Sequence, residues 1–451
     1  MQPTYPSEKI KVNQMNTQIE SAKTGKITEE MQTVARDEGI PVSDLRQRLA
    51  RGTVIITRNV LRGNVHPIGI GEGLRTKVNA NIGTSSDLSD VKLEIAKAKI
   101  ASKNGADTVM DLSTSGNLNQ IRRKLIKSIT IPFGSVPIYQ SAIETAVKKG
   151  SIVDMTEDDI FNTIEQQAKD GVDFITVHCG VTKQIVKHIT EHPRLMGVVS
   201  RGGTFLVTWI LHNKKETPLY ENFDYLLELA KRYDITLSLG DAFRPGSIFD
   251  STDWPQMQEL LTIGKLVERA YRANVQTMVE GPGHIPLNHI DANVHLEKSV
   301  CKGAPFYVLG PVVTDIAPGY DHIVAAIGGS LAAMAGADFL CYVCPSEHLG
   351  IPTIEDVKAG VVTMRIAAHA ADIVKLGSKA SVWDLRMDQA RAKLDWSKQF
   401  KLALDSDQAR KVHERVKPKV AGTCTMCGKW CALKLLADQL NKPELARITC
   451  L

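Results

Sequence analysis

One junction recurs through the middle of the chain: an amphipathic helix ends at a small or turn residue, and a short apolar strand follows. The five copies lie at 103–111, 169–178, 232–241, 272–280 and 335–343. The turn residue favours a left-handed helix C-cap, and the continuous apolar run fits a parallel strand covered on both faces. Further strands are predicted at 77–83, 133–139, 197–200 and 306–313. Eight or nine strands that alternate with helices predict an α/β fold, a (β/α)8 barrel of the TIM type.

The length of 451 residues allows such a barrel together with accessory segments. We expect a small N-terminal α+β segment at 1–75, the barrel at 76–376, and a C-terminal helical extension at 377–451. An open, doubly wound sheet is the alternative. It has less support because no G-x-G-x-x-G turn opens a helix after the first strand.

The two accessory segments have their own helical patterns. In the N-terminal segment we predict helices at 15–36 and 42–51 and a short strand at 54–56. In the C-terminal segment we predict helices at 380–404 and 407–416, followed by a linker rich in Lys and Pro. That linker leads to a cysteine-rich loop.

Charge and hydropathy exclude some partners. The net charge is +5, from 55 Lys and Arg against 50 Asp and Glu, and no long basic block carries it, so we expect no nucleic-acid partner. The stretch 324–344 is nearly free of charge, but its glycines and Asp338 favour a buried helix followed by a buried strand over a membrane span. We therefore expect no membrane association.

The first residues suggest the compartment. Residues 1–11 contain no apolar stretch, so we expect no secretory signal and a cytoplasmic protein. In that compartment thiols stay reduced, which favours metal or redox chemistry over disulfides for the eight cysteines.

Three of those cysteines form a compact motif near the C-terminus: Cys424, Cys427 and Cys431. Three thiolates in one loop can hold three irons of a [4Fe–4S] cluster and leave the fourth iron open. An open iron can bind S-adenosylmethionine (SAM), a pair that generates radicals. The same spacing also fits a zinc knuckle with Cys450 or a histidine as fourth ligand, and spacing alone leaves both interpretations open.

Polar side chains follow most of the predicted strands. In TIM-type barrels the reactive groups collect at the carboxyl ends of strands. The residues at or just past those ends are Asn81, Asp111, Tyr139, His178, Ser200, Asp241, Glu280 and His348. The sequence therefore predicts an active site at this rim.

Two of the following loops contain a histidine. In EGPGHIP (280–286) and CPSEHLG (344–350), Gly and Pro bend the backbone and hold His284 and His348 above their strands. Two imidazoles from such loops can bind one divalent metal with positions left open, or each can hydrogen-bond loop backbone.

Two other loops have charged groups beside glycines. SRGG (200–203) can present backbone N–H groups and the Arg201 guanidinium to a phosphate, although a plain turn has the same composition. GDAFRPG (240–246) places Asp241 and Arg244 three residues apart, where they can hold a polar substrate or pair with each other. Cys179, Cys301 and Cys341 lie in apolar surroundings and are expected to pack as small hydrophobes.

These motifs occur together and in an order that closely resembles the phosphomethylpyrimidine synthase (ThiC) family, in its short form. The motifs are KVNANIG (77–83), VPIYQ (136–140), SRGG (200–203), EGPGH (280–284), APFY (304–307), TDIAPGYDH (314–322) and the cysteine triplet. The resemblance covers about 15–431. It implies a radical SAM enzyme of thiamine biosynthesis, a cytoplasmic homodimer that converts 5-aminoimidazole ribotide to 4-amino-5-hydroxymethyl-2-methylpyrimidine phosphate and depends on an electron donor.

The resemblance also implies residue roles. Cys424, Cys427 and Cys431 would hold the [4Fe–4S] cluster, and His284 and His348 would bind a divalent metal, zinc in the family. The substrate pocket would be lined by Asn81, Met110, Tyr139, His178, Ser200, Arg201, Gly202, Asp241, Ala242, Phe243, Arg244, Glu280 and Tyr307.

Two alternatives remain. Ala242 and Phe243 stand where the family usually has Gly-Leu. This departure keeps open a close paralogue, 5-hydroxybenzimidazole synthase, which starts from the same ribotide and serves cobamide assembly. The other alternative is a zinc-dependent barrel hydrolase that uses His284, His348 and Glu280, with the cysteine loop as a structural zinc site.

Overall fold

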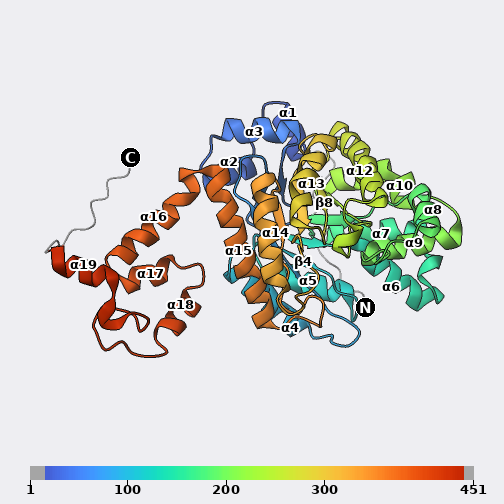
Figure 1. Cartoon of the computed structure of the whole chain (residues 1–451). Coiled ribbons are helices and arrows are strands. Elements are labelled where there is room, and N and C mark those ends of the chain that lie inside the picture. The colour runs from blue at the N-terminus through green and yellow to red at the C-terminus, as the bar shows by residue number, and fades with distance from the viewer. Residues whose placement is uncertain (1–15, 441–451) are drawn as a thin grey trace, which may run out of the picture. The chain divides into compact units, whose positions relative to one another are not determined.

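The computed structural model describes residues 16–440 of the chain, with side chains to residue 436. It divides into two compact units, Met1–Ala371 and Asp372–Leu451. The first unit contains all the strands of the described residues (Figure 1). The three-part division at 75 and 376 stays a prediction.

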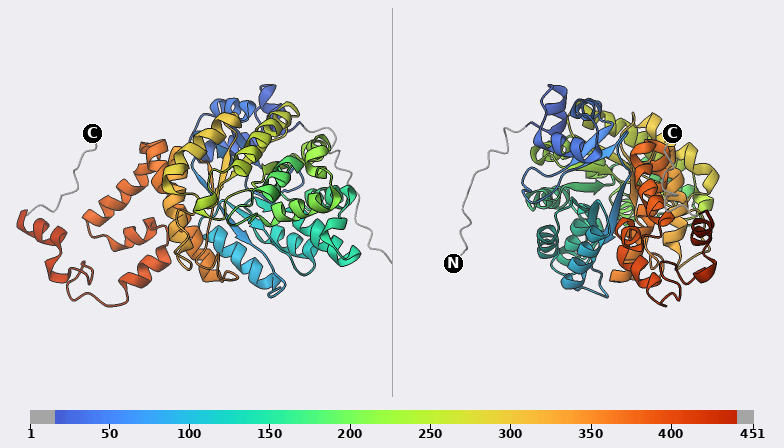
Figure 2. Two further views of the ribbon diagram at one scale, coloured as in Figure 1. Left: turned by 45° about the vertical axis from the view of Figure 1, so that its right-hand side comes forward. Right: turned by 90° about the vertical axis from the view of Figure 1, so that its left-hand side faces the viewer.

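The first unit is a closed barrel of eight parallel strands, which confirms the predicted fold. Around the barrel the order is β10-β3-β4-β5-β6-β7-β8-β9. The strands are β3 (Lys77–Ile82), β4 (Thr108–Asp111), β5 (Phe133–Ser135), β6 (Phe174–Val177), β7 (Thr236–Leu239), β8 (Thr277–Gly281), β9 (Phe306–Leu309) and β10 (Phe339–Cys341). The left panel of Figure 2 shows these strands enclosed by helices.

The surrounding helices connect one strand to the next, except α15, which follows the last strand. They are α4 (Val91–Lys103), α5 (Leu118–Ser128), α6 (Pro137–Lys149), α7 (Glu157–Lys169), α8 (Lys183–Glu191), α9 (Arg201–Asn213), α10 (Pro218–Glu221), α11 (Phe223–Tyr233), α12 (Trp254–Arg272), α13 (Leu287–Val300), α14 (Asp321–Ala335) and α15 (Ile354–Leu376). α14 followed by β10 confirms the helix and strand predicted within 324–344. β10 is buried, whereas α14 is buried on one face and exposes Ile327 and Met334 on the other. Within the described residues, no helix has both the length and the apolar composition needed to cross a membrane.

The recurring junction has a common backbone conformation. In each of the five copies the predicted turn residue has a positive φ, and these residues are Gly105, Gly171, Asp234, Asn274 and Gly336. A left-handed residue ends the helix and redirects the chain into the next strand. The local sequence therefore accounts for five of the eight strand entries.

Aromatic rings fill the barrel interior. Phe339 stacks on Tyr307 with ring centroids 4.2 Å apart and meets Phe174 edge-on at 6.4 Å. The neighbouring Gly134 leaves room for Phe174, since a Cβ at Gly134 would lie 2.2 Å from the ring. The interior is thus a packed core beneath the rim.

The N-terminal segment lies at the amino ends of the strands, opposite the rim. It consists of α1 (Gln18–Lys23), α2 (Glu29–Glu38), α3 (Val42–Arg51) and an antiparallel pair, β1 (Val54–Thr57) with β2 (Ile68–Gly71). The Thr17 hydroxyl donates to the Asn274 carbonyl at 2.9 Å, and buried Lys77 pairs with Glu38 at 2.8 Å. These contacts join the segment to the strand entries.

Four predicted elements of the first unit are wrong in detail, because local turns and caps outweigh the apolar pattern. The helix at 15–36 is split where Gly25 has φ 84° and Thr28 caps α2. The strand at 133–139 stops at Ser135, since Pro137 begins α6. Residues 197–200 form no strand, because Ser200 is the N-cap of α9, and the strand at 306–313 ends at Leu309.

The second unit is helical, with α16 (Ser378–Ala392), α17 (Trp396–Leu402), α18 (Ser406–His413), the short 3₁₀ turn η4 (Gly428–Trp430) and α19 (Ala432–Leu440). The helix predicted at 380–404 is broken at Leu394, which has φ 53°, before Asp395 caps α17. The Trp396 indole donates to the Gly422 carbonyl at 2.9 Å. This bond anchors the chain just before the cysteine loop.

We predict that Gly134→Ala destabilises the barrel by about 1–3 kcal/mol or more, because its methyl group overlaps the Phe174 ring. Gly63→Ala is the matched control, since nothing lies within 4 Å of a Cβ there. Denaturant unfolding of both variants measures the difference. Equal stability of the two variants would contradict the described core packing.

Candidate active site

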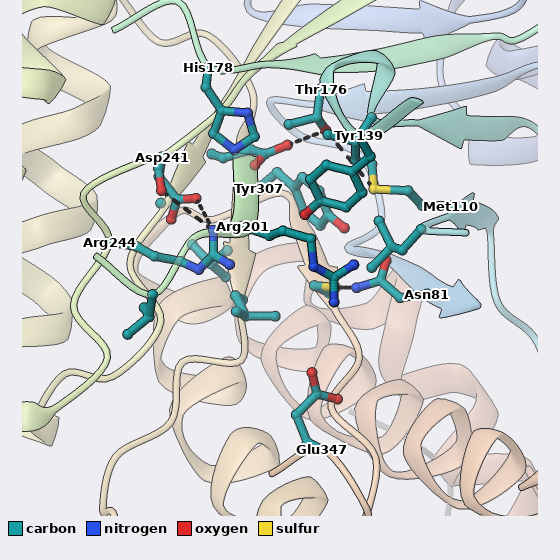
Figure 3. A pocket seen from close by; sticks show the side chains of 18 residues that line it. Asn81, Met110, Tyr139, Thr176, His178, Arg201, Asp241, Arg244, Tyr307 and Glu347 are labelled. Atoms are coloured by element: carbon teal, nitrogen blue, oxygen red, sulfur yellow. Dashed lines mark hydrogen bonds and ion pairs between the residues drawn. The ribbon is translucent and has the colours of Figure 1, made fainter. Parts of the chain in front are cut away.

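A cavity of about 260 Å³ opens at the carboxyl ends of the barrel strands (Figure 3). Its polar lining includes two guanidinium groups and three carboxyl groups. The lining residues are Asn81, Met110, Leu112, Val136, Tyr139, Thr176, His178, Val199, Arg201, Asp241, Arg244, Glu280, Gly281, Tyr307, Val308, Leu309, Cys341 and Glu347. A small polar or anionic ligand fits this composition.

Glu280, near the end of β8, is oriented by hydroxyl groups on β6 and β7. Its Oε1 atom accepts hydrogen bonds from the Thr176 hydroxyl at 2.7 Å and the Ser238 hydroxyl at 2.6 Å. Burial raises the pKa of Glu280, while the two hydroxyls act in the opposite direction. The carboxyl group is thus fixed in position beside the cavity.

His178 is held as a neutral imidazole. Its Nε2 atom hydrogen-bonds the Ser200 hydroxyl at 3.0 Å, and its Nδ1 atom is buried with no protein partner. Burial, together with the nearby Arg244, lowers the pKa of His178 to about 3. A Cβ at Gly202 would lie 2.3 Å from the ring, so glycine is required there. Nδ1 is thus a buried atom beside Gly202 that has no hydrogen-bond partner in the described residues.

The loop after β7 presents Asp241 and Arg244. Arg244 donates to Asp241 Oδ1 at 3.1 Å, while the buried Oδ2 atom has no protein partner. Burial raises the pKa of Asp241 to about 7, against the lowering effect of Arg244. The two residues thus pair with each other and also line the cavity.

Glu259, on α12, fastens this loop from behind. Its two carboxyl oxygens accept the backbone N–H groups of Ala242 and Phe243 at 2.9 and 2.8 Å. The side chains of Ala242 and Phe243 are fully buried and do not line the cavity. The position of this loop therefore depends on a buried carboxyl group outside the cavity lining.

Arg201 is the first residue of α9, and its guanidinium lies 5.0 Å from the centre of the Tyr139 ring. Figure 3 shows both side chains at the cavity. Since Ser200 caps α9, the first turn of this helix also lies at the rim. Helix N-termini and guanidinium groups both favour phosphate.

The closing strands contribute a second polar cluster. Asn81 donates to the Cys341 sulfur at 3.1 Å, and Asn79 donates to the Tyr307 hydroxyl at 2.7 Å. Burial raises the pKa of Cys341 to about 12, so its thiol is protonated. Cys341 thus lines the cavity, whereas Cys179 and Cys301 pack in the core as predicted.

The structure brings most of the predicted substrate residues to this cavity. Asn81, Met110, Tyr139, His178, Arg201, Asp241, Arg244, Glu280 and Tyr307 line it. Ser200 and Gly202 stand behind His178, and Ala242 and Phe243 lie behind the loop.

Sequence reasoning missed Thr176, Cys341 and Glu347 as lining residues. Thr176 lies on β6, two positions before His178, which directly follows the strand, so the two-residue repeat of a strand was the available signal. Glu347 adjoins His348 and lies across the cavity from His178 and Tyr139 (Figure 3).

His284 and His348 form a pair with ring centroids 5.2 Å apart. Each Nδ1 atom is bonded to a carboxylate at 2.7 Å, His284 to Asp315 and His348 to Asp321. Carboxylates on Nδ1 are typical of metal-binding histidines, which bind through Nε2. Two imidazoles on one tetrahedral zinc, at about 2.0–2.1 Å per bond, have their ring centres about 5 Å apart. The pair therefore fits a shared ion.

The cysteine triplet forms a tight loop in the second unit. The Gly428 N–H group donates to the Cys424 carbonyl at 3.0 Å, and the Trp430 N–H group donates to the Cys427 carbonyl at 2.9 Å. All three thiols are free, a donor set that fits a cluster with one open iron. Within the described residues no three His, Cys, Asp or Glu side chains surround a single point as metal ligands, and Cys450 lies outside those residues.

Comparison with known proteins gives consistent matches over nearly the whole chain. The family model described as "Radical SAM ThiC family" matches residues 17–438. A phosphomethylpyrimidine synthase of Methanocaldococcus jannaschii is 56% identical, over 94% of this chain and 100% of its own length. One from Caldanaerobacter subterraneus is also 56% identical, over 95% and 99%. A solved dihydropteroate synthase of Coxiella burnetii is 12% identical with a TM-score of 0.37, over 66% of this chain and 94% of its own.

We predict that Asp241 makes the free energy of unfolding fall as the pH rises. A carboxyl group whose pKa is raised to about 7 on folding stabilises the fold below its ordinary pKa near 3.8, and this contribution is lost as the pH rises to about 7. The loss is at most about 1.4 kcal/mol per pH unit. Asp241→Asn should remove this dependence of stability on pH.

Unfolding of the cluster-free protein between pH 4 and 7.5 measures this effect. Asp87→Asn, which removes an exposed carboxylate, is the control. If wild type and Asp241→Asn have parallel pH profiles, the carboxyl group is not desolvated as described.

Proposed function

Because the chain belongs to the radical SAM ThiC family, we propose that it is a phosphomethylpyrimidine synthase acting in thiamine biosynthesis. Its substrate is 5-aminoimidazole ribotide, and its product is 4-amino-5-hydroxymethyl-2-methylpyrimidine phosphate. The observation that carries the proposal is the family match over 17–438, which includes both the barrel rim and the cysteine triplet. The composition of the cavity supports it.

The phosphate of the ribotide is bound by the guanidinium of Arg201. This group lies at the first turn of α9, so its charge adds to that of the helix N-terminus. Arg244 contributes a second positive charge to the same cavity. Together they neutralise a phosphate dianion.

The aminoimidazole base binds beside the neutral and acidic side chains of the cavity. His178, uncharged because of its burial, offers Nδ1 with no competing protein partner. Asp241, with a pKa near neutrality, can hold or release a proton on Oδ2. Asn81 and Glu280 complete a polar lining that orients a heteroaromatic ring.

Membership in a radical SAM family implies a [4Fe–4S] cluster and SAM. Cys424, Cys427 and Cys431 would hold the cluster. With SAM and an electron donor it would supply the 5′-deoxyadenosyl radical. The residues of the cavity bind and orient the ribotide and exclude water. We place the enzyme in the cytoplasm as a homodimer.

His284 and His348 bind one divalent ion, most consistent with zinc. The support is the 5.2 Å separation of the rings and the carboxylate on each Nδ1. Burial lowers the pKa of His284, which favours the neutral imidazole needed by a ligand, although Asp315 acts in the other direction. Two protein ligands leave the other positions to water or a bound small molecule.

The departure at Ala242 and Phe243 is weak support for a benzimidazole product. Both side chains are fully buried behind the loop, so they do not change the groups that face the ligand. The zinc-dependent hydrolase loses support because the family match extends over the cysteine triplet.

Product analysis tests the assignment. Reconstituted enzyme with the ribotide, SAM and a reductant should yield the hydroxymethylpyrimidine phosphate and 5′-deoxyadenosine. Cys427→Ala should reduce turnover below detection, since a cluster ligand is lost, while the barrel stays folded. A fluorescent benzimidazole product would instead assign the paralogue, and ribotide-independent hydrolysis would reject the radical function.

The metal assignment is tested separately by elemental analysis. We predict that His284→Ala and His348→Ala each lose the divalent ion while retaining cluster iron. Asp315→Asn should weaken zinc affinity by about 10–100-fold, because the imidazole loses its anchoring carboxylate. His295→Ala, on the exposed side of α13, is the control. If the zinc content is unchanged in both histidine variants, His284 and His348 form hydrogen bonds only and bind no metal ion.

A further inference from the structure

A second, smaller cavity adjoins the substrate pocket. Its volume is about 30 Å³, and it shares Asp241, Arg244, Glu280 and Gly281 with the pocket lining. It continues between α12 and α13 to Gln256, Glu259, Leu260, Ile263, Pro282, Asn293, Glu297 and Phe306. A buried water molecule needs about 10–15 Å³ of such volume, so the cavity has room for about two water molecules.

Two carboxyl groups that line this cavity have buried oxygens with no nitrogen or oxygen hydrogen-bond partner in the described residues. They are Asp241 Oδ2 and both carboxyl oxygens of Glu297. Glu297 is 0% exposed. Buried polar atoms are nearly always bonded to protein or to ordered water, so these oxygens indicate water in the cavity.

The groups around Glu297 define its charge environment. Its Oε2 atom lies 4.0 Å from the Lys298 ammonium, which also bonds Asp338 at 2.5 Å. The Cys301 thiol, one turn further along, interacts with the Glu297 carboxyl group and opposes the rise of its pKa. Glu259 faces the cavity from α12. Burial raises the pKa of Glu297 to about 8, with Lys298 opposing this shift. Glu297 thus retains its proton at neutral pH.

We propose that water in this cavity connects Asp241 to Glu297, and that Glu297 is an internal proton store for the substrate pocket. The proposal rests on the assignment of the larger cavity as the ribotide site. When Asp241 gives its proton to a bound group, a proton leaves the Glu297 carboxyl group and passes through the water to Asp241. One O–H bond breaks at each donor, one forms at each acceptor, and no electrons are transferred.

This transfer moves negative charge away from the pocket. The charge comes to rest on Glu297, 4.0 Å from the Lys298 ammonium, which stabilises the carboxylate. Asp241 is then protonated again from within the protein. Glu297 touches no substrate and acts only through Asp241.

Infrared spectroscopy tests the connection without turnover. The C=O stretch of a protonated carboxyl group is distinct from that of a carboxylate, so Glu297→Gln should remove one such band at pH 7. Asp241→Asn should shift the Glu297 band if water joins the two groups. An unshifted band would overturn the proposal, as would a high-resolution structure of the wild type with an empty cavity.

Kinetics test the role in the reaction. Glu297→Gln keeps the shape and neutrality of the protonated acid, so KM for the ribotide should stay within about twofold. We predict that kcat falls at least about tenfold and that the solvent deuterium isotope effect increases. Glu268→Gln is the control. Glu268 lies on α12, where it pairs with Arg272 one turn further along.

Wild-type kcat and isotope effect in Glu297→Gln would overturn the proton store even if the water is present. If the wild type itself makes no pyrimidine, the proposed function fails. The infrared result then still decides whether Asp241 and Glu297 are connected.

Discussion

The pairing of β10 with β3 closes the barrel, and the site depends on that closure. Phe339, Leu340 and Cys341 pair with Lys77, Val78 and Asn79. Because all eight strands are parallel, closure brings their carboxyl ends to one rim. Asn81 from the first barrel strand then meets Cys341 from the last, and both face the same cavity as Glu280. An open sheet would leave these groups on opposite edges.

Around this rim, each reactive group is held by a neighbour from another element. Glu280 takes its orientation from hydroxyls on β6 and β7, His178 from Ser200 at the start of α9, and the Asp241 loop from Glu259 on α12. Burial then keeps the imidazole neutral and the acids close to their protonated forms. The site is thus preorganised, and its low dielectric strengthens the effect of the two guanidinium groups.

The fold was predictable from sequence where its signals are local. The five repeated junctions place strands correctly because a left-handed turn residue and an apolar run both lie within one short segment. The errors arose where a cap overrides hydropathy, as at Pro137, Ser200, Gly25 and Leu394. Clustering of polar residues at strand ends was also predictable, since parallel strands share one edge.

The sequence by itself determined the barrel, the rim and the three-cysteine loop, because periodicity, turn residues and motif spacing are properties of neighbouring residues. Only the tertiary structure decided which side chains share the cavity. It added Thr176, Cys341 and Glu347, and it moved Ala242 and Phe243 behind their loop. It also placed Asp241 and Glu297 in the lining of one small cavity, although α12 and β8 separate them in the sequence. Such contacts depend on barrel closure and helix packing, which bring together residues distant in sequence.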